Sequence, residues 1–401
     1  MNRGPWHQCG DRSQKLVVEQ IEHGAGVGVI LSTRDLSYQK AEQYAAIYHD
    51  LGAQVLIDLQ FYVPGFTNIS LASYPTHEYR AKISQMQPLS DNDLNGLTVA
   101  LQEINQNINA DGIISPAIIY QAGRPDTVQT NARLFSISKQ VGDELGIPTY
   151  ATVVLGKSVT SSDKTLEEIL SPATSLLADG WYFIFEFDPE RIPSQVESVS
   201  RCCIAGLRLA CTGRPVLHAY AGPMALLSFG FGANAAGIGH CQNLWKFCPE
   251  RWQPQRRRTG GTKAPARFFS RSLWGTIVYP DEVARMSIGL QEQILTSSPF
   301  STQITPGKPF LSITRWNANK HLVHAICSTV AEIAAVNEPR INATQAISLL
   351  QEAVKLHGTI VDTGLTLRDN TNVYQENWRL VLNELLENQS SDFDYLELLR
   401  T

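Results

Sequence analysis

The chain has 401 residues, of which 43% are hydrophobic and 18% are charged, and it contains 28 glycines and 20 prolines. This composition is typical of a globular protein and excludes a wholly disordered, collagen-like or coiled-coil chain. The length fits two or three ordinary domains, or one α/β barrel of about 250 residues with an appended region.

The charge balance limits the classes of partner. With 33 Lys and Arg against 38 Asp and Glu, the formal net charge is -5. Wholesale attraction to nucleic acid or anionic lipid is therefore not expected, and any site for a polyanion must be local. The seven cysteines are an odd number and the first residues lack the apolar run of a signal peptide, so we expect reduced thiols in a cytoplasmic protein. No apolar stretch approaches the ~20 residues needed to span a bilayer, so we expect no membrane contact.

Short β-rich runs alternate with longer segments of helical period, which favours βα units. In the first such unit, a strand at 27–31 precedes a helix at 37–51, which begins with a serine in N-cap position and ends at Gly52. A strand at 54–58 follows that helix. Further strands are predicted at 112–119, 149–155, 181–187, 215–219, 232–238 and 273–279.

Eight such strands predict an α/β fold, a (βα)8 barrel of the TIM type over residues 1–282. An open doubly wound sheet is the alternative that periodicity leaves open. Residues 283–401 have mainly helical periodicity, and we expect them to form a helical C-terminal region that packs on the barrel. Nothing in the sequence predicts an oligomeric state.

In a parallel barrel the catalytic groups follow the carboxyl ends of the strands. Asp58 and Glu186 each end a strongly apolar run, so burial should raise their pKa and suit them to acid/base or nucleophilic work. The alternative is that they accept hydrogen bonds from loop amides or pair with Arg34. His218 and His240 are the other candidate catalytic residues, and a core histidine is the alternative for His218. The candidate substrate-binding residues, all near strand ends, are Arg34, Gln60, Tyr62, Tyr120, Tyr220 and Gly222.

The most basic part of the chain is the segment 246–272, which we expect to be a loop insertion in the barrel. Its candidate nucleic-acid-binding residues, interleaved with aromatic side chains, are Arg256, Arg257, Arg258, Lys263 and Arg267. Such a segment could neutralise phosphates and stack bases, so nucleic acid is the expected partner. A solvated loop without a partner is the alternative.

We expect no metal and no cofactor. His240, Cys241 and Cys248 could hold zinc, but the six-residue gap between the cysteines and the lack of a second pair make this a poor zinc motif. No Gly-x-Gly-x-x-Gly sequence follows a predicted strand, so a dinucleotide site of the Rossmann type is not supported.

Two segments resemble the tRNA-guanine transglycosylases, barrel enzymes that exchange a guanine in nucleic acid for a deazaguanine. Residues 218–247 contain a strand with His218, the turn Gly222-Pro223, a short helix and a strand that starts with Gly232-Ala233, as in the sixth-to-seventh strand segment of that family. The segment 55–61, with Asp58, is similar to the family's base-recognition segment. The chain departs from the family at 236–238, where the nucleophilic aspartate is missing, and it lacks the family's zinc motif.

The resemblance implies that Asp58 contacts the base and assists proton transfer. The nucleophile would then have moved, for example to Glu186 or Asp188, with Tyr62 or Tyr120 stacking on a flipped base. Three functions stay open at this point. They are a transglycosylase-like enzyme acting on the N-glycosidic bond of a nucleobase in nucleic acid, a barrel enzyme for a small sugar or phosphorylated metabolite, and a catalytically degenerate nucleic-acid-binding or interaction subunit.

Overall fold

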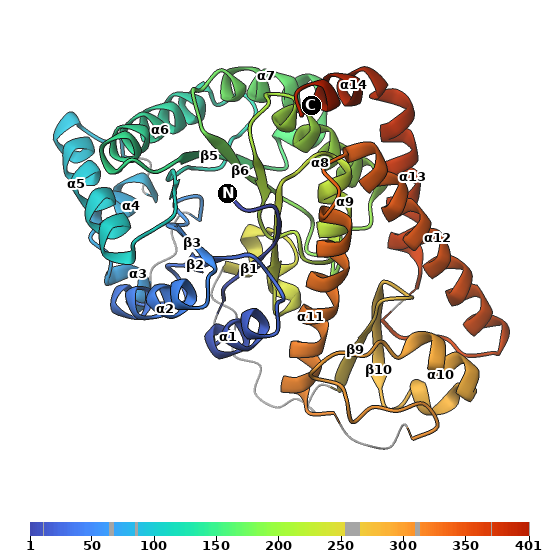
Figure 1. Ribbon diagram of the computed structural model, residues 1–401. Coiled ribbons are helices and arrows are strands. Elements are labelled where there is room, and N and C mark those ends of the chain that lie inside the picture. The colour runs from blue at the N-terminus through green and yellow to red at the C-terminus, as the bar shows by residue number, and fades with distance from the viewer. Residues whose placement is uncertain are drawn as a thin grey trace.

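The computed structural model describes residues 1–10, 12–63, 68–84, 87–252, 265–308, 313–369 and 371–400. Its centre is an eight-stranded parallel sheet with the strand order β3-β2-β1-β8-β7-β6-β5-β4 (Figure 1). The strands are β1 (Gly4–Gln8), β2 (Gly28–Ser32), β3 (Gln54–Asp58), β4 (Ile113–Ile114), β5 (Thr149–Leu155), β6 (Gly180–Phe185), β7 (Val216–His218) and β8 (Ala235–Gly239). Between the end strands β3 and β4, the Asp111 amide donates to the Val55 carbonyl at 2.9 Å. The sheet is thus a nearly closed barrel, and the predicted fold is confirmed.

The predicted eighth barrel strand, at 273–279, is wrong. The apolar run at 273–279 forms β10 (Gly275–Tyr279), which pairs antiparallel with β9 (Ala266–Ser270) in a separate hairpin. The additional barrel strand is β1, which has no clear sequence signal because it is short and carries the polar residues His7 and Gln8. It is hydrogen-bonded in parallel to both β2 and β8. Alternation of apolar residues does not distinguish a hairpin strand from a barrel strand.

Helices follow the strands and form the outer ring of the barrel. They are α1 (Gln14–Glu22), α2 (Tyr38–Asp50), α3 (Ile69–Ala72), α4 (His77–Ser84), α5 (Asp91–Ile108), α6 (Pro125–Leu145), α7 (Asp163–Thr174), α8 (Val196–Ala210) and the short α9 (Ala225–Gly230). Local sequence sets their ends: α5 begins with a capping box in which Ser90 and Asp93 bond to each other's backbone amides. Helix α6 ends where Gly146 adopts a left-handed conformation with φ of 68°.

The helix that accompanies β8 begins only after a long insertion. Helix α11 (Arg315–Ala334) packs against β1 and β8 and so completes the outer ring. Residues 240–314 lie between β8 and this helix, and they include the hairpin and α10 (Ile288–Ile294). The hairpin, α10, α11 and α12 share a hydrophobic cluster that contains Phe268, Ile277 and Leu290. In Figure 1 the hairpin and α10 lie at the lower right, away from the barrel strands.

The remaining C-terminal helices are α12 (Pro339–Asp362), α13 (Val373–Asn388) and α14 (Ser390–Leu398). Helix α12 packs on α9, and α13 packs on α8. The Trp378 indole of α13 donates to the Pro193 carbonyl at 2.8 Å. These helices add a layer outside the ring, and the predicted boundary at residue 282 falls inside the insertion between β8 and α11.

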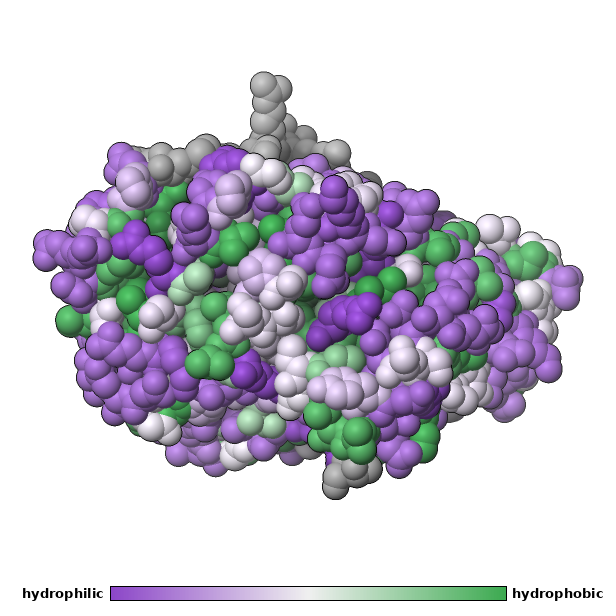
Figure 2. Space-filling view, turned by 90° about the horizontal axis from the view of Figure 1, so that it is seen from above, coloured by the Kyte–Doolittle hydropathy of each residue, from purple (hydrophilic) through white to green (hydrophobic). Residues whose placement is uncertain are grey.

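Strand alternation separates two buried layers. Outward-facing residues form the core between barrel and helices, whereas Trp6, Ile30, Leu56, Tyr182 and Ile184 belong to the cluster inside the barrel. Within the described residues, no helix combines the length and apolarity needed to cross a bilayer. The face seen in Figure 2 is mainly hydrophilic, with small scattered hydrophobic patches.

Substitution of Gly28 tests the packing of β1 against β2. A Cβ atom at Gly28 would lie 2.6 Å from the ring of Trp6, which is itself fully buried. We expect Gly28→Ala to lower the free energy of unfolding by about 1–3 kcal/mol. The control is Gly289→Ala in α10, where a Cβ meets no atom within 4 Å and where alanine is the better helix former. Urea unfolding of both variants measures the difference, and equal stability would contradict the expectation.

Candidate functional site

A buried polar cluster lies inside the barrel around Asp58, the last residue of β3. Its Oδ1 accepts a hydrogen bond from the Gln60 amide at 3.0 Å. Its Oδ2 accepts from the Tyr182 hydroxyl of β6 at 2.9 Å and from the Tyr62 hydroxyl. The Tyr220 hydroxyl, after β7, lies 2.8 Å from that of Tyr62 and accepts from Gln60 Nε2 at 2.9 Å. These five residues, here called the Asp58 cluster, unite side chains from β3, from β6 and from the segments that follow β3 and β7.

The backbone is strained at two of these residues. Gln60 and Tyr220 have φ values of 55° and 53°, in the left-handed region that non-glycine residues rarely adopt. Their side chains contact each other, and Ser32 Oγ donates to Gln60 Oε1 at 3.1 Å. Strain of this kind persists only where surrounding contacts hold it, and it is concentrated at functional sites.

The Asp58 carboxyl has unusual electrostatics. Burial raises its pKa to about 6, although hydrogen bonds from Tyr62, Tyr182 and the Gln60 amide oppose the rise. Burial and the negative charge of Asp58 raise the pKa of the Tyr62 and Tyr182 hydroxyls well above their usual value. A carboxyl that titrates near neutral pH can act as a general acid or a general base.

The Asp58 cluster is closed to solvent. Each of its five side chains is at most 3% exposed. The Phe247 ring covers it, with ring centroids 5.2 Å from Tyr62 and 5.9 Å from Tyr220. Asp58 is 1% exposed, so a ligand contacts its carboxyl group only after neighbouring side chains move.

The side chain of Gln8, at the end of β1, lies inside the barrel near this cluster. It is 1% exposed, and neither its amide nitrogen nor its amide oxygen makes a hydrogen bond of good geometry to any described residue. Tyr182 is close to it, and a Cβ at Gly237 would lie 3.0 Å from Gln8 Oε1. A buried amide of this kind indicates a place for a water molecule or for a polar group of a ligand.

Glu186 lies at the mouth of the barrel, after the end of β6. Strand alternation directs its side chain to the same side as those of Tyr182 and Ile184. Its Oε2 accepts from the Lys157 amide at 3.1 Å, and burial raises its pKa. It makes no hydrogen bond to the Asp58 cluster within the described residues. Glu186 thus accepts a hydrogen bond from a loop amide, as the alternative in the sequence analysis has it. Its position at the mouth of the barrel is also compatible with an acid/base role.

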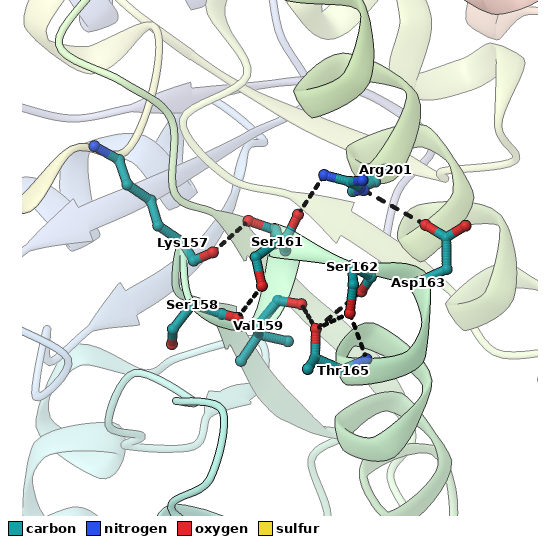
Figure 3. A network of polar contacts seen from close by, with 9 residues as sticks. Lys157, Ser158, Val159, Ser161, Ser162, Asp163, Thr165 and Arg201 are labelled. Carbon is teal, nitrogen blue, oxygen red and sulfur yellow. Dashed lines mark hydrogen bonds and ion pairs between the residues drawn. The ribbon is translucent and has the colours of Figure 1, made fainter.

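The loop after β5 that carries Lys157 is braced by a polar network (Figure 3). Arg201, from α8, donates to the Thr160 carbonyl at 2.9 Å and pairs with Asp163. Ser161 Oγ donates to the Ser158 carbonyl at 2.8 Å. Ser162 Oγ accepts the Thr165 amide at 3.2 Å and thereby caps α7. Thr160 Oγ1 donates to the Lys157 carbonyl at 3.2 Å, which joins Lys157 to this network.

Two cavities adjoin at the carboxyl end of the barrel, and Gln242 and Asn243 line both of them. The first, of about 210 Å³, is lined by His240, Arg267, Thr276 and Arg315 among others, and we call it the basic cavity. The second, of about 490 Å³, is lined by Glu190, Arg191, Lys246, Cys248 and Glu250, and we call it the mixed cavity. No Asp or Glu is among the described residues that line the basic cavity.

The charges around the basic cavity sum to a positive value. Asp369 pairs with both Arg191 and Arg267, so this triad keeps one unit of positive charge. Arg191 Nη2 also donates to Thr276 Oγ1 at 2.8 Å. Arg315, in the first turn of α11, is exposed and forms no ion pair with another described residue. Guanidinium groups in this setting suit a carboxylate or phosphate ligand.

The structure separates His218 from the Asp58 cluster. Its side chain points outward from β7, with Nδ1 2.8 Å from Ser228 Oγ and with the rings of Phe183 and Phe231 beside it. Burial lowers its pKa to about 3. These contacts match the core-histidine alternative.

Three other predicted substrate-binding residues make backbone or core contacts. The Arg34 amide donates to Gln60 Oε1 at 3.2 Å, so Arg34 borders the Asp58 cluster. Tyr120 belongs to the core between barrel and helices, where burial raises its pKa to about 12. Gly222 has φ of 50°, and a Cβ there would lie within 2.6 Å of the Trp245 backbone. The Gly222 backbone thus packs on Trp245 and is not open to a substrate.

The predicted basic and zinc-binding residues have different locations. Arg267 lines the basic cavity together with His240 and Cys241, whereas Cys248 lines the mixed cavity. No group of three potential metal ligands gathers in the part of the chain that the structure describes. The remaining predicted nucleic-acid-binding residues lie outside the described residues; they are Arg256, Arg257, Arg258 and Lys263.

Three residues that line the cavities were not predicted from the sequence; they are Arg191, Lys246 and Arg315. Arg191 and Lys246 could have been found, because each lies in a loop that follows a barrel strand. Arg315 carried no such signal, since it lies on the far side of the insertion between β8 and α11.

Comparisons with known proteins give no family for this chain. No family model and no curated protein matches it. Among solved structures, protein SMc04130 from Sinorhizobium meliloti 1021 is 11% identical, with 62% of this chain and 97% of that chain covered and a TM-score of 0.32. A xylose isomerase-like TIM barrel/4-hydroxyphenylpyruvate dioxygenase fusion protein is 12% identical, with 61% and 39% covered and a TM-score of 0.33. The chain spans about two fifths of the fusion protein, and neither similarity bears on activity.

The raised pKa of Asp58 predicts how stability depends on pH. The folded protein binds the proton of the Asp58 carboxyl more tightly than the unfolded chain does. Protonation of Asp58 therefore stabilises the fold fully below pH 3.8, and this stabilisation is lost as the pH rises through about 6. The asparagine of an Asp58→Asn variant does not titrate. The free energy of unfolding of this variant relative to the original protein should therefore rise by up to about 3 kcal/mol between pH 4 and pH 7.

Urea unfolding at four pH values measures this difference. Tyr62→Phe removes a hydrogen bond that lowers the pKa of Asp58, so it should move the fall in stability to higher pH. Parallel stability profiles for all three proteins would show that Asp58 has an ordinary pKa.

Proposed function

We propose that this chain is a barrel enzyme for a small metabolite that carries a phosphate or a similar anionic group. The anionic group would bind in the basic cavity, and the reacting part of the molecule would lie in the mixed cavity. The observation that carries this proposal is the pair Arg267 and Arg315, which line a cavity with no acidic side chain among its described lining residues.

The position of the cavity supports the proposal. It lies between the loop after β8 and the first turns of α11, the helix that accompanies β8. In (βα)8 enzymes, loops after the seventh and eighth strands frequently bind phosphate, and active sites lie at this end of the barrel. Two arginines can each donate two hydrogen bonds to a phosphate, which fixes its orientation as well as its charge.

The groups at the mouth can supply acid/base chemistry. Glu190 and Glu250 line the mixed cavity, and the nearby charges of Glu250 and Asp188 act on Glu186. Burial is the main cause of the raised pKa of Glu186, and it favours the protonated form that a general acid needs. A metabolite held by its anionic group would therefore meet carboxyl groups at its other end.

Base exchange in nucleic acid is a second candidate function, favoured by the Asp58 cluster and the buried amide of Gln8. Asp58 and Gln8 together could accept from and donate to the edge of a flipped base. Pro265, which lines the basic cavity, belongs to the same basic segment 246–272 as Arg256, Arg257 and Arg258. A polynucleotide could thus place one phosphate in this cavity and others along the segment.

Arg315→Ala tests the first function. We expect this substitution to weaken binding of inorganic phosphate about tenfold, because it removes charge-assisted hydrogen bonds without breaking an ion pair between described residues. Titration calorimetry measures the affinity. Arg133→Ala is the control, since this half-exposed arginine of α6 lies outside both cavities. Equal phosphate affinity of both variants and the original protein would refute the assignment of the basic cavity.

Binding of labelled tRNA across a salt series tests the second function. Replacing Arg256, Arg257 and Arg258 together by alanine should reduce the slope of log affinity against log salt by about 2, as expected for three lost contacts to single-stranded phosphates. No binding of tRNA to the original protein at low salt would end this candidate. If the protein binds phosphate but not tRNA, the result supports the small-metabolite enzyme over base exchange in nucleic acid.

A further inference from the structure

We infer that the ligand is a phosphorylated sugar, whose hydroxyl groups lie in the mixed cavity while its phosphate binds in the basic cavity. This inference rests on the proposed function, because the basic cavity sets where the phosphate lies. The mixed cavity, of about 490 Å³, is within the range of about 300–1,000 Å³ that ligand sites occupy. The chemistry of its lining residues indicates what kind of group it accepts.

The mixed cavity offers little contact to an apolar or aromatic group. Among its described lining residues, only Pro189 has a purely hydrocarbon side chain, and none has an aromatic ring. Sites for apolar and aromatic ligands are lined mainly by hydrophobic and aromatic side chains, because burial of apolar surface drives such binding. A polar group that forms hydrogen bonds is therefore the better match for this cavity.

The carboxylates that line the mixed cavity can accept hydrogen bonds from a ligand. Glu250 is exposed, and its carboxylate makes no hydrogen bond or ion pair with another described residue. Glu190 accepts from the Ser194 amide and hydroxyl and from Gln195 Nε2, at 3.2, 2.8 and 2.9 Å, so its side chain is held in place. A carboxylate has about four acceptor sites, so Glu190 can accept a further bond and Glu250 several. These groups favour a ligand with hydrogen-bond donors and repel a second phosphate.

The wall that the two cavities share supplies amide groups. Gln242 and Asn243 line both cavities. In the orientation that meets the guanidinium, the Gln242 amide oxygen accepts from Arg191 Nε and Nη2 at 2.7 Å, which fixes the side chain and leaves Nε2 as a donor. The Asn243 side chain is exposed and makes no hydrogen bond to another described residue, so its amide can both donate and accept.

This combination of acceptors and donors matches the hydroxyl groups of a sugar. A hydroxyl group both donates and accepts, so it can donate to a carboxylate and accept from an amide at the same time. An ammonium group only donates, and it could not pair with Gln242 Nε2. Because the amides line both cavities, the hydroxyl groups nearest the phosphate would meet Gln242 and Asn243. Those farther along the sugar would meet Glu190 and Glu250.

Titration calorimetry with a set of phosphates tests the inference. The ligands are D-ribose 5-phosphate, D-glucose 6-phosphate, phenyl phosphate, O-phosphoethanolamine and inorganic phosphate. We expect one or both sugar phosphates to bind at least about tenfold more tightly than the other three, because only a sugar can pair with the carboxylates and the amides together. Equal affinity for all five, or a preference for phenyl phosphate or O-phosphoethanolamine, would overturn the inference.

Glu250→Gln tests whether the hydroxyl groups lie in the mixed cavity. We expect the affinity for the preferred sugar phosphate to fall about tenfold, because charge-assisted hydrogen bonds are lost, and the affinity for inorganic phosphate to change less than about threefold. Glu292→Gln is the control, because this exposed glutamate of α10 lines neither cavity. The Tm of each variant shows whether it folds.

The outcomes separate the inference from the proposed function. A preference for sugar phosphates that Glu250→Gln leaves intact would overturn the inference, because the hydroxyl groups would then bind elsewhere. Binding of inorganic phosphate without a preference for sugar phosphates would overturn the inference alone. If the original protein binds none of the five phosphates, the proposed function itself is overturned.

Discussion

The rest of the structure depends on the hydrogen bonding of β1 to both β2 and β8. This strand of five residues closes the barrel between its neighbours. Trp6 of β1 fills the interior against Gly28, and the side chain of Leu244 occupies the space beside Gly239 at the end of β8. Closure brings the carboxyl ends of the eight strands to one mouth. The Asp58 cluster and both cavities lie at that end because the chain comes together there.

The two candidate sites differ in their physical character. The Asp58 cluster is a buried polar network in which a carboxyl, three hydroxyls and an amide are hydrogen-bonded to one another. Such a network stabilises one arrangement of the interior and loses much of its value if one member is removed. The cavities have the opposite character, with charged groups around open space. This contrast is why the proposed function places the ligand in the cavities and gives the Asp58 cluster only the second candidate function.

Much of the barrel could be predicted from the sequence, because apolar runs and N-cap or glycine signals mark β2 to β8. The grouping of Asp58, Gln60 and Tyr62 was also accessible, since all three follow one strand. His218 shows how alternation could have been used further: Leu217 and Ala219 face the interior, so the residue between them faces outward. Pairing across the long insertion was not accessible. Neither the hairpin of β9 and β10 nor the approach of Arg315 to the loop after β8 has a local signal.

Asp369 gives the C-terminal layer a direct connection to the basic cavity. This carboxylate comes from the segment between α12 and α13, yet it pairs with both Arg191 and Arg267 at the mouth of the barrel. An anion bound beside Arg267 competes with Asp369 for the same guanidinium group. Binding of the anion and attachment of this segment are therefore thermodynamically linked. The factor by which attachment of the segment lowers the affinity for the anion equals the factor by which the bound anion weakens attachment of the segment.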